Sequence, residues 1–221
     1  MKLVVSRGKA LTRILRTDEE PLGKHRIGIF IDTHLDGTCT MSSPLDPLPM
    51  ELLPCVIVIM GVSGSGKSTI ASALANRLQW PFQEGDDLHS PANHAKMQSG
   101  TPLTDADRLP WLQKIAEWID THPYGVVTCS ALKRSYRELI VGERKNVRLV
   151  YLQAERQLLE GRMGRRKGHF MPARLLDSQL ATLEEPGADE GAVVVRVDDG
   201  PVEQTVDEIV RKLKEPAVPC S

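Results

Sequence analysis

The sequence predicts an α/β fold in which a doubly wound, five-stranded parallel sheet has helices on both faces and a lid at one end. Three observations support this prediction. Short apolar runs rich in β-branched residues alternate with amphipathic stretches of helical length, as in strands joined by right-handed crossover helices. The first apolar run is followed at once by a glycine-rich turn and a helical segment. With 221 residues, the chain is long enough to bury one full core.

The glycine-rich turn fits the pattern G-x-x-x-x-G-K-[ST], which is typical of phosphate-binding loops. Its glycines allow the backbone to wrap so that successive N–H groups converge on phosphate oxygens, and the following helix adds its dipole. Lys67 can reach the outer phosphates, and the Ser68 hydroxyl can bind Mg²⁺. An ordinary Gly/Ser turn is the alternative. The position between a buried strand and a helix favours nucleotide binding by Gly61, Val62, Ser63, Gly64, Ser65, Gly66, Lys67, Ser68 and Thr69.

The other elements are expected to alternate. The first strand is predicted at residues 56–60 and further strands at 80–86, 126–130, 147–152 and 192–197. Helices are predicted at 70–78, 91–97, 109–119, 133–141, 155–163, 175–183 and 202–213, with a polar turn at 99–108. Because ligands bind at the carboxyl ends of parallel strands, residues 61–69, 84–89 and 130–133 should surround one crevice.

The first 53 residues differ from the rest of the chain. Residues 1–16 contain five basic residues and no acid, and residues 44–49 contain three prolines, which disfavour a regular element. A targeting segment and sequence upstream of the true start both remain open. We expect a poorly ordered extension at 1–53, one domain at 54–215 and a short tail at 216–221.

Composition excludes several classes of function. The net charge is −1, so no overall field attracts nucleic acid or an anionic membrane, and no apolar run approaches the roughly 18 residues of a membrane span. Four cysteines are scattered without metal-ligand spacing, and Cys55 and Cys129 lie in apolar runs as reduced core residues. The expected location is the cytoplasm, with no nucleic-acid or membrane partner.

The residues around the loop favour a kinase for a small molecule. A GTPase should carry D-x-x-G and N-K-x-D after the loop, and neither occurs. A motor ATPase usually has an apolar strand that ends in Asp, whereas the third strand here ends in Cys129-Ser130. The chain instead has acids after the second strand and an arginine-rich stretch at 162–170, which can close as a lid and exclude water.

Several separated motifs resemble the gluconokinase family. In order they are Gly85-Asp86-x-Leu88-His89, Asn93-x-x-Lys96-Met97-x-x-Gly100-x-Pro102-Leu103-x-Asp105-x-Asp107-Arg108-x-Pro110-Trp111-Leu112, Cys129-Ser130-Ala131-Leu132-Lys133-x-x-Tyr136-Arg137, Gly168-His169-Phe170 and Thr182-Leu183-Glu184-x-Pro186. The resemblance covers about residues 56–213. It implies a nucleoside-monophosphate-kinase-like fold and phosphorylation of D-gluconate at its 6-hydroxyl by ATP. It also leaves a homodimer open.

Roles on the acceptor side follow from side-chain chemistry. Asp86 is the candidate carboxylate that orients the attacking hydroxyl, and a helix-capping acid is the alternative. On an extended strand Glu84 would point the same way as Asp86 and hold Mg²⁺ together with Ser68, although Asp is more usual at this position. Arg108 suits the gluconate carboxylate, unless it pairs with a neighbouring Asp. His89 and Lys133 are further candidates for binding the substrate hydroxyls.

Two arginines of the expected lid match the family pattern. Arg166 is the candidate for the transferring phosphoryl group, and Arg162 for the ATP phosphates or for stacking on adenine. A solvated basic surface is the alternative for each. The competing functions are a kinase for another hydroxy acid, such as shikimate, and a nucleotide-binding regulator without catalysis. We therefore predict Lys67, Asp86 and Arg166 as the catalytic residues.

Overall fold

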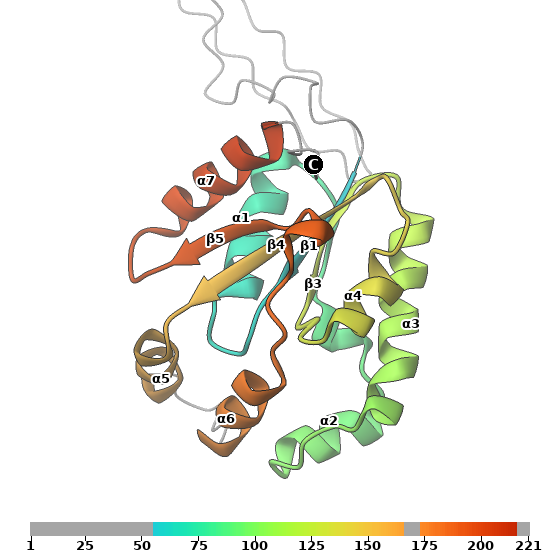
Figure 1. Cartoon of the computed structure of the whole chain (residues 1–221), viewed down its shortest axis with the longest axis vertical. Helices are drawn as coiled ribbons and strands as arrows, with labels where there is room; N and C mark the ends of the chain where they lie inside the picture. The colour runs from blue at the N-terminus through green and yellow to red at the C-terminus, as the bar shows by residue number, and fades with distance from the viewer. Residues whose placement is uncertain (1–54, 166–172, 216–221) are drawn as a thin grey trace, which may run out of the picture. The chain divides into compact units, whose positions relative to one another are not determined.

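The computed structural model describes residues 55–165 and 173–215, so the predicted extension at 1–53 and the tail at 216–221 lie outside the described residues. The described part is built on one parallel sheet of five strands in the order β2-β3-β1-β4-β5, which confirms the predicted fold class (Figure 1). The strands are β1 (Val56–Met60), β2 (Phe82–Gln83), β3 (Gly125–Cys129), β4 (Val147–Ala154) and β5 (Val193–Val197).

Helices connect the strands throughout. They are α1 (Lys67–Leu78), α2 (Pro91–Gln98), α3 (Asp105–Thr121), α4 (Arg134–Ile140), α5 (Arg156–Arg165), α6 (Ala173–Thr182) and α7 (Val202–Lys214), with 3₁₀ turns η1 (Gly85–Leu88) and η2 (Ala188–Glu190). Ser90 caps α2 by accepting a hydrogen bond from the Asn93 N–H, and Pro91 occupies the first turn.

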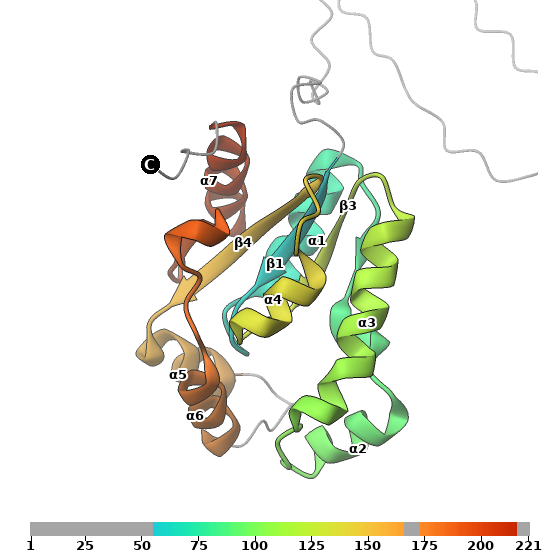
Figure 2. The same ribbon diagram turned by 45° about the vertical axis from the view of Figure 1, so that its right-hand side comes forward.

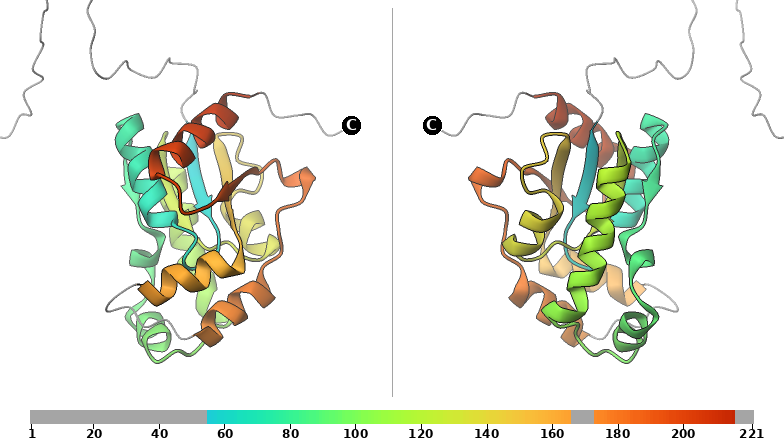
Figure 3. Two further views of the ribbon diagram at one scale, coloured as in Figure 1. Left: turned by 90° about the vertical axis from the view of Figure 1, so that its left-hand side faces the viewer. Right: turned by 90° about the vertical axis from the view of Figure 1, so that its right-hand side faces the viewer.

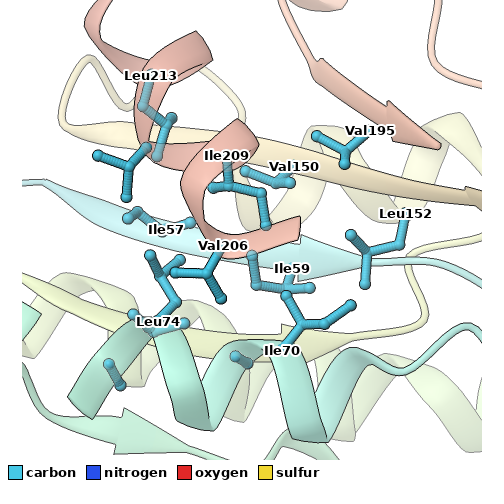
Figure 4. Packing of buried hydrophobic residues seen from close by; sticks show 14 of the residues in the cluster. Ile57, Ile59, Ile70, Leu74, Val150, Leu152, Val195, Val206, Ile209 and Leu213 are labelled. Carbon is cyan, nitrogen blue, oxygen red and sulfur yellow. The ribbon is translucent and has the colours of Figure 1, made fainter. Parts of the chain in front are cut away.

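The central strand β1 is fully buried and its side chains alternate between two cores. Ile57 and Ile59 pack with α1 and α7, as Figure 4 shows for a cluster that includes Leu74 and Ile209. Val58 and its even-numbered neighbours pack on the other face with α3 and α4. Figure 3 shows this three-layer arrangement from two sides. A strand buried on both faces explains the uninterrupted apolar run in the sequence.

The second strand is shorter than predicted. It ends at Gln83, and the chain turns into η1 at Gly85. Gly85 packs against the end of β3, where its N–H donates to the Thr128 hydroxyl at 2.8 Å. The prediction that Glu84 and Asp86 point the same way along an extended strand is therefore wrong, because the alternation of side chains ends where the 3₁₀ turn begins.

Helix α3 begins earlier than predicted, at Asp105 rather than at residue 109. Thr104 and Asp107 form a capping box, in which the Asp107 N–H donates to the Thr104 hydroxyl and the Asp107 carboxylate accepts from the Thr104 N–H at 2.9 Å. Residues that read as a polar turn are thus the first turn of the helix. Arg108 is therefore displayed on a helix and not on a loop.

The carboxyl ends of the strands are covered by α2, α5 and α6, as Figures 1 and 2 show. A small third core fills part of this end and joins Val62, Leu132, Leu159 and Leu176, which come from four different segments. Strand β1 has β3 on one side and β4 on the other, and this switch in strand order is where ligands bind in such sheets. No helix in the described part of the chain is both long and apolar enough to span a bilayer.

Candidate active site

The loop after β1 has the backbone conformation that anion binding requires. Gly64 and Gly66 have φ angles of 86° and 94°, in the left-handed region that side chains disfavour. A Cβ on Gly61 would lie 2.9 Å from the Leu152 carbonyl oxygen, so this position also needs glycine. Gly66 caps α1, which places the helix N-terminus at the loop. The loop therefore has the backbone conformation that the predicted phosphate cradle needs.

The two polar groups predicted to assist this cradle lie at its rim. The Lys67 ammonium donates to the Val62 carbonyl at 3.2 Å and so folds back over the loop. Ser68 and Thr69 are exposed in the first turn of α1. Hydroxyl oxygens at this position suit Mg²⁺, which keeps much of its water shell and takes few protein ligands.

A cavity of about 230 Å³ adjoins the loop. Arg162 of α5 forms one wall, with a guanidinium nitrogen 3.4 Å from the carbonyl oxygens of both Gly64 and Ser65. Its other terminal nitrogen donates to the Asp198 carbonyl in the connection between β5 and α7. The remaining lining comes mainly from α1, β5 and α7, namely Gly66, Thr69, Ile70, Val197, Gly200, Val202 and Thr205. A planar cation and apolar groups facing a cavity suit a nucleotide base.

Asp86 stands exposed in η1, on a turn that is fixed from two sides. The Trp111 indole N–H donates to the Gly85 carbonyl at 2.7 Å, and the Thr128 hydroxyl accepts a hydrogen bond from the Gly85 N–H. The same Thr128 hydroxyl donates to the Glu84 carboxylate. The Glu84 carboxylate is therefore held against β3 by Thr128, whereas Asp86, two residues later in the sequence, is exposed.

Three of the predicted site residues lie near enough to Cys129, the last residue of β3, for their charges to act on it. Burial raises the pKa of the Cys129 thiol to about 12, and the charges of Asp86, Lys67 and Arg108 also act on that thiol. Cys129 itself is 1% exposed, which confirms it as a core residue. The loop lysine, the η1 carboxylate and the α3 guanidinium thus share one neighbourhood at the carboxyl end of the sheet.

Arg108 has no ion pair with either neighbouring acid among the described residues. Asp107 pairs instead with Lys96 at 2.6 Å. This ion pair, together with the hydrogen bonds from Thr104, lowers the pKa of Asp107 to about 2. Asp105 pairs with Lys133 at 2.7 Å and accepts from the Tyr136 hydroxyl at 2.5 Å. The Lys133 bond lowers the pKa of Asp105 and raises that of Lys133. The Arg108 guanidinium remains available to an anionic ligand.

His89 directly follows the η1 turn that carries Asp86, and it is 7% exposed. Its ring stacks on Trp111 with centroids 4.2 Å apart, and Nδ1 is 3.3 Å from the Asn93 amide nitrogen. Burial, with the charges of His94, Arg108 and Lys114, lowers the pKa of His89 to about 4. The ring is therefore neutral at pH 7.

Comparison with known proteins identifies the family. A family model described as an AAA domain matches residues 56–186. A gluconokinase of Gluconobacter oxydans is 50% identical over 166 residues, which are 73% of this chain and 93% of that protein. The chain belongs to the gluconokinase family. A solved gluconokinase from Sinorhizobium meliloti is 46% identical with a TM-score of 0.67, and the match covers 73% of this chain and 92% of that one.

More distant kinases share only the fold. A shikimate kinase from Bacteroides thetaiotaomicron is 18% identical with a TM-score of 0.55, over 73% of this chain and 99% of that one. This likeness agrees with the predicted P-loop architecture. It gives no support to shikimate as the substrate, since identity at this level shows the fold alone.

Within this gluconokinase-family chain, the position of one predicted catalytic residue is open. Arg166, like His169, lies outside the described residues, because the structure describes residues 55–165 and 173–215. Helix α5, which contains Arg162, ends at Arg165, and α6 begins at Ala173. The role of Arg166 therefore stays a prediction.

Sequence reasoning overlooked three residues that hold the site in place. Thr128 was predicted only as part of a strand and Trp111 was named only within a family motif, yet both bind the backbone of Gly85. Gln179 of α6 was not singled out, and its amide binds Ser63 of the phosphate loop. A polar residue inside an otherwise apolar strand was a usable signal for Thr128. Nothing in the local pattern marked Gln179, whose partner is 116 residues away.

Proposed function

We propose that this protein transfers the γ-phosphoryl group of ATP to the 6-hydroxyl of D-gluconate, giving 6-phospho-D-gluconate and ADP. The observation that carries the proposal is the joining of three segments in a chain of the gluconokinase family: the loop with Lys67 follows β1 beside β3, the η1 turn with Asp86 is bound to Thr128 of β3, and α3 with Arg108 is bound to that turn through Trp111. A phosphate cradle, a carboxylate and an unpaired guanidinium are the groups needed to bring a donor phosphate and an anionic polyol together.

On the donor side, residues 61–69 form the loop around the phosphates, which bind to the α1 N-terminus and to the backbone N–H groups from Gly64 onward. The Lys67 ammonium contributes charge toward the outer phosphates. The base occupies the cavity of about 230 Å³ beside Arg162, where the guanidinium stacks on it or contacts the phosphates. Arg166 supplies a second cation to the transferring group, and Lys67, Asp86 and Arg166 together form the catalytic set.

On the acceptor side, the Arg108 guanidinium binds the gluconate carboxylate through two parallel hydrogen bonds. Asp86 accepts a hydrogen bond from the 6-hydroxyl and receives its proton. A bond then forms between that oxygen and the γ-phosphorus while the bond to the bridging oxygen of ADP breaks. Lys133, fixed by Asp105, and neutral His89 contact the hydroxyls between the two ends of the substrate.

The residues present also fit a magnesium ion. Ser68 at the start of α1 and the Glu84 carboxylate after β2 offer the hard oxygen atoms that this ion prefers, and we assign them to it directly or through water. When bound, the ion neutralises charge on the phosphate oxygens. The Thr128 hydroxyl holds the Glu84 carboxylate, which keeps its direction fixed.

The domain boundaries and cellular setting follow the sequence. We assign kinase activity to residues 54–215 and expect a protein lacking residues 1–49 to keep it. A small anionic substrate and reduced, buried Cys55 and Cys129 favour work in the cytoplasm. Loss of folding or activity on this truncation would overturn the boundary.

The test uses the full chain with Mg-ATP and a panel of hydroxy acids that includes gluconate and shikimate. We expect 6-phosphogluconate from gluconate, detected by a coupled dehydrogenase, and no product from shikimate. The decisive variant is Asp86→Asn, for which we expect kcat to fall at least about 100-fold while ATP affinity stays within twofold. Asp87→Asn is the matched control, because Asp87 is also exposed in η1.

Other outcomes point to the competing functions. ATP binding without turnover of any acid would favour a nucleotide-binding regulator. Product from shikimate but not gluconate would favour the other small-molecule kinase. An Asp86→Asn protein as active as Asp87→Asn would remove Asp86 from the mechanism.

A further inference from the structure

The side chain of Gln179 binds the phosphate loop with both ends of its amide. Its oxygen accepts from the backbone N–H of Ser63 at 2.7 Å, and its nitrogen lies 3.0 Å from the Ser63 hydroxyl, which accepts. The two residues are 116 positions apart, so α6 reaches across the fold to a single residue of the loop. The pair is partly buried, which protects both bonds from competition by water.

The packing of α6 does not depend on this contact. Leu176 of α6 lies in the third core with Val62, Leu132 and Leu159. The Asp177 carboxylate pairs with Arg156 of α5 at 2.8 Å, which adds a second attachment. These contacts already fix the helix beside the loop. The Gln179 amide therefore adds a directional contact to a backbone group.

The contacted residue is where the loop needs external support. Ser63 directly precedes Gly64, one of the positive-φ glycines in the cradle. Glycine has the widest choice of backbone conformations, so a loop rich in it loses much entropy when fixed for phosphate. A bond to the Ser63 N–H restricts the Val62–Ser63 peptide, one residue before Gly64. Binding a phosphate to a loop already fixed costs less free energy.

We infer that Gln179 is a positioning residue for the nucleotide, which holds the Ser63–Gly64 segment in its phosphate-binding conformation. This inference rests on the proposed function, since it assumes that the loop binds ATP. It places the effect of Gln179 on nucleotide affinity and not on gluconate. The Ser63 N–H is occupied by Gln179, so the cradle itself consists of the N–H groups that follow.

The experiment measures the Kd of a non-hydrolysable ATP analogue and the two KM values for Gln179→Leu in the full chain. We expect the analogue to bind about tenfold more weakly, the KM for ATP to rise in parallel, and the KM for gluconate to stay within twofold. Gln113→Leu is the matched control, because Gln113 is an exposed helical glutamine of α3 whose side chain makes no hydrogen bond among the described residues. We expect it to match the wild type.

Two further variants separate positioning from general stability. Ser63→Ala removes the hydroxyl contact but keeps the N–H bond, so we expect a loss of about two- to threefold. Added to Gln179→Leu, it should cause no further loss, because the contact is already absent. If Gln179→Leu does not fold, Gln179→Asn, whose amide is one methylene too short to make both bonds, should weaken nucleotide binding in the same direction.

An unchanged analogue Kd in Gln179→Leu, or an equal rise in both KM values, would overturn the inference. Failure of the wild type to bind the analogue or to phosphorylate gluconate would instead overturn the proposed function. The wild-type measurement thus distinguishes the two failures.

Discussion

Replacing Gly85 by alanine tests whether the η1 turn sets the position of Asp86. A Cβ at residue 85 would lie 1.9 Å from the Thr128 carbonyl oxygen, whereas real Cβ contacts stay above 3.0 Å. The turn must therefore move away from β3 by about 1.1 Å, the difference between these distances. The bonds that Gly85 makes to Trp111 and Thr128 stretch or break, at about 1 kcal/mol each. Overpacking adds about 1–3 kcal/mol.

We expect Gly85→Ala to lower the free energy of unfolding by about 3–5 kcal/mol, measured by urea denaturation. Because a displacement of about 1 Å can slow an aligned reaction about 100-fold, kcat for gluconate should fall by at least that factor. Gly164→Ala is the control: a Cβ there meets nothing within 4 Å, and alanine favours a helix by about 0.5–1 kcal/mol. A Gly85→Ala protein with wild-type kcat, whatever its stability, would refute the claim that this turn positions Asp86.

Three further predictions concern buried polar groups. The Ser65 hydroxyl is fully buried without a hydrogen-bond partner among the described residues, so Ser65→Ala should raise the free energy of unfolding by about 1 kcal/mol, and a loss of stability in urea would contradict this. Between pH 6.5 and about 4 the unfolded chain binds a proton at His89 that the folded chain does not. The free energy of unfolding should therefore decrease as the pH is lowered through this window, by about 3 kcal/mol more in the wild type than in His89→Gln. Parallel pH profiles of the two proteins would refute this prediction. Arg137→Met leaves the largely enclosed Glu190 carboxylate without its ion-pair partner and should cost about 3 kcal/mol in urea, against about 0.5 kcal/mol for the exposed Arg148→Met. Equal losses in these two variants would contradict that role for Arg137.

The sheet was predictable because its signals are local. The central strand β1 is a short apolar run, and its burial on both faces leaves no polar residue to obscure the pattern. The phosphate loop was predictable for a similar reason, since its glycines and Lys67 occur at fixed spacing within one short stretch of sequence. Fold class and the donor half of the site therefore followed from neighbouring residues alone.

The acceptor half was harder because tertiary contacts decide it. Residues 80–86 have strand propensity, but the strand ends at Gln83 because Gly85 approaches β3 closely, in a contact across 43 positions. The polar composition of residues 99–108 concealed the Thr104–Asp107 capping box that starts α3. Competition between Lys133, Lys96 and Arg108 for the two aspartates of α3 also could not be resolved without coordinates. The sequence predicted which residues belong to the acceptor half of the site, but it did not predict which of them pair with one another.

The contacts of Arg137 show why so many buried polar groups surround a site whose chemistry needs few. This arginine is 2% exposed, and its guanidinium donates to the carbonyls of Ala131, Leu132 and Glu184 and to the Glu190 carboxylate. Ala131 has a φ of 43°, a conformation unfavourable for a residue with a Cβ, and it lies two residues before Lys133. Such strain persists only where the surroundings impose it. Phosphoryl transfer depends mainly on placing donor and acceptor in line. A chain that meets this demand with loops at the ends of strands must fix those loops by their backbones, as Arg137, Trp111 and Thr128 do here.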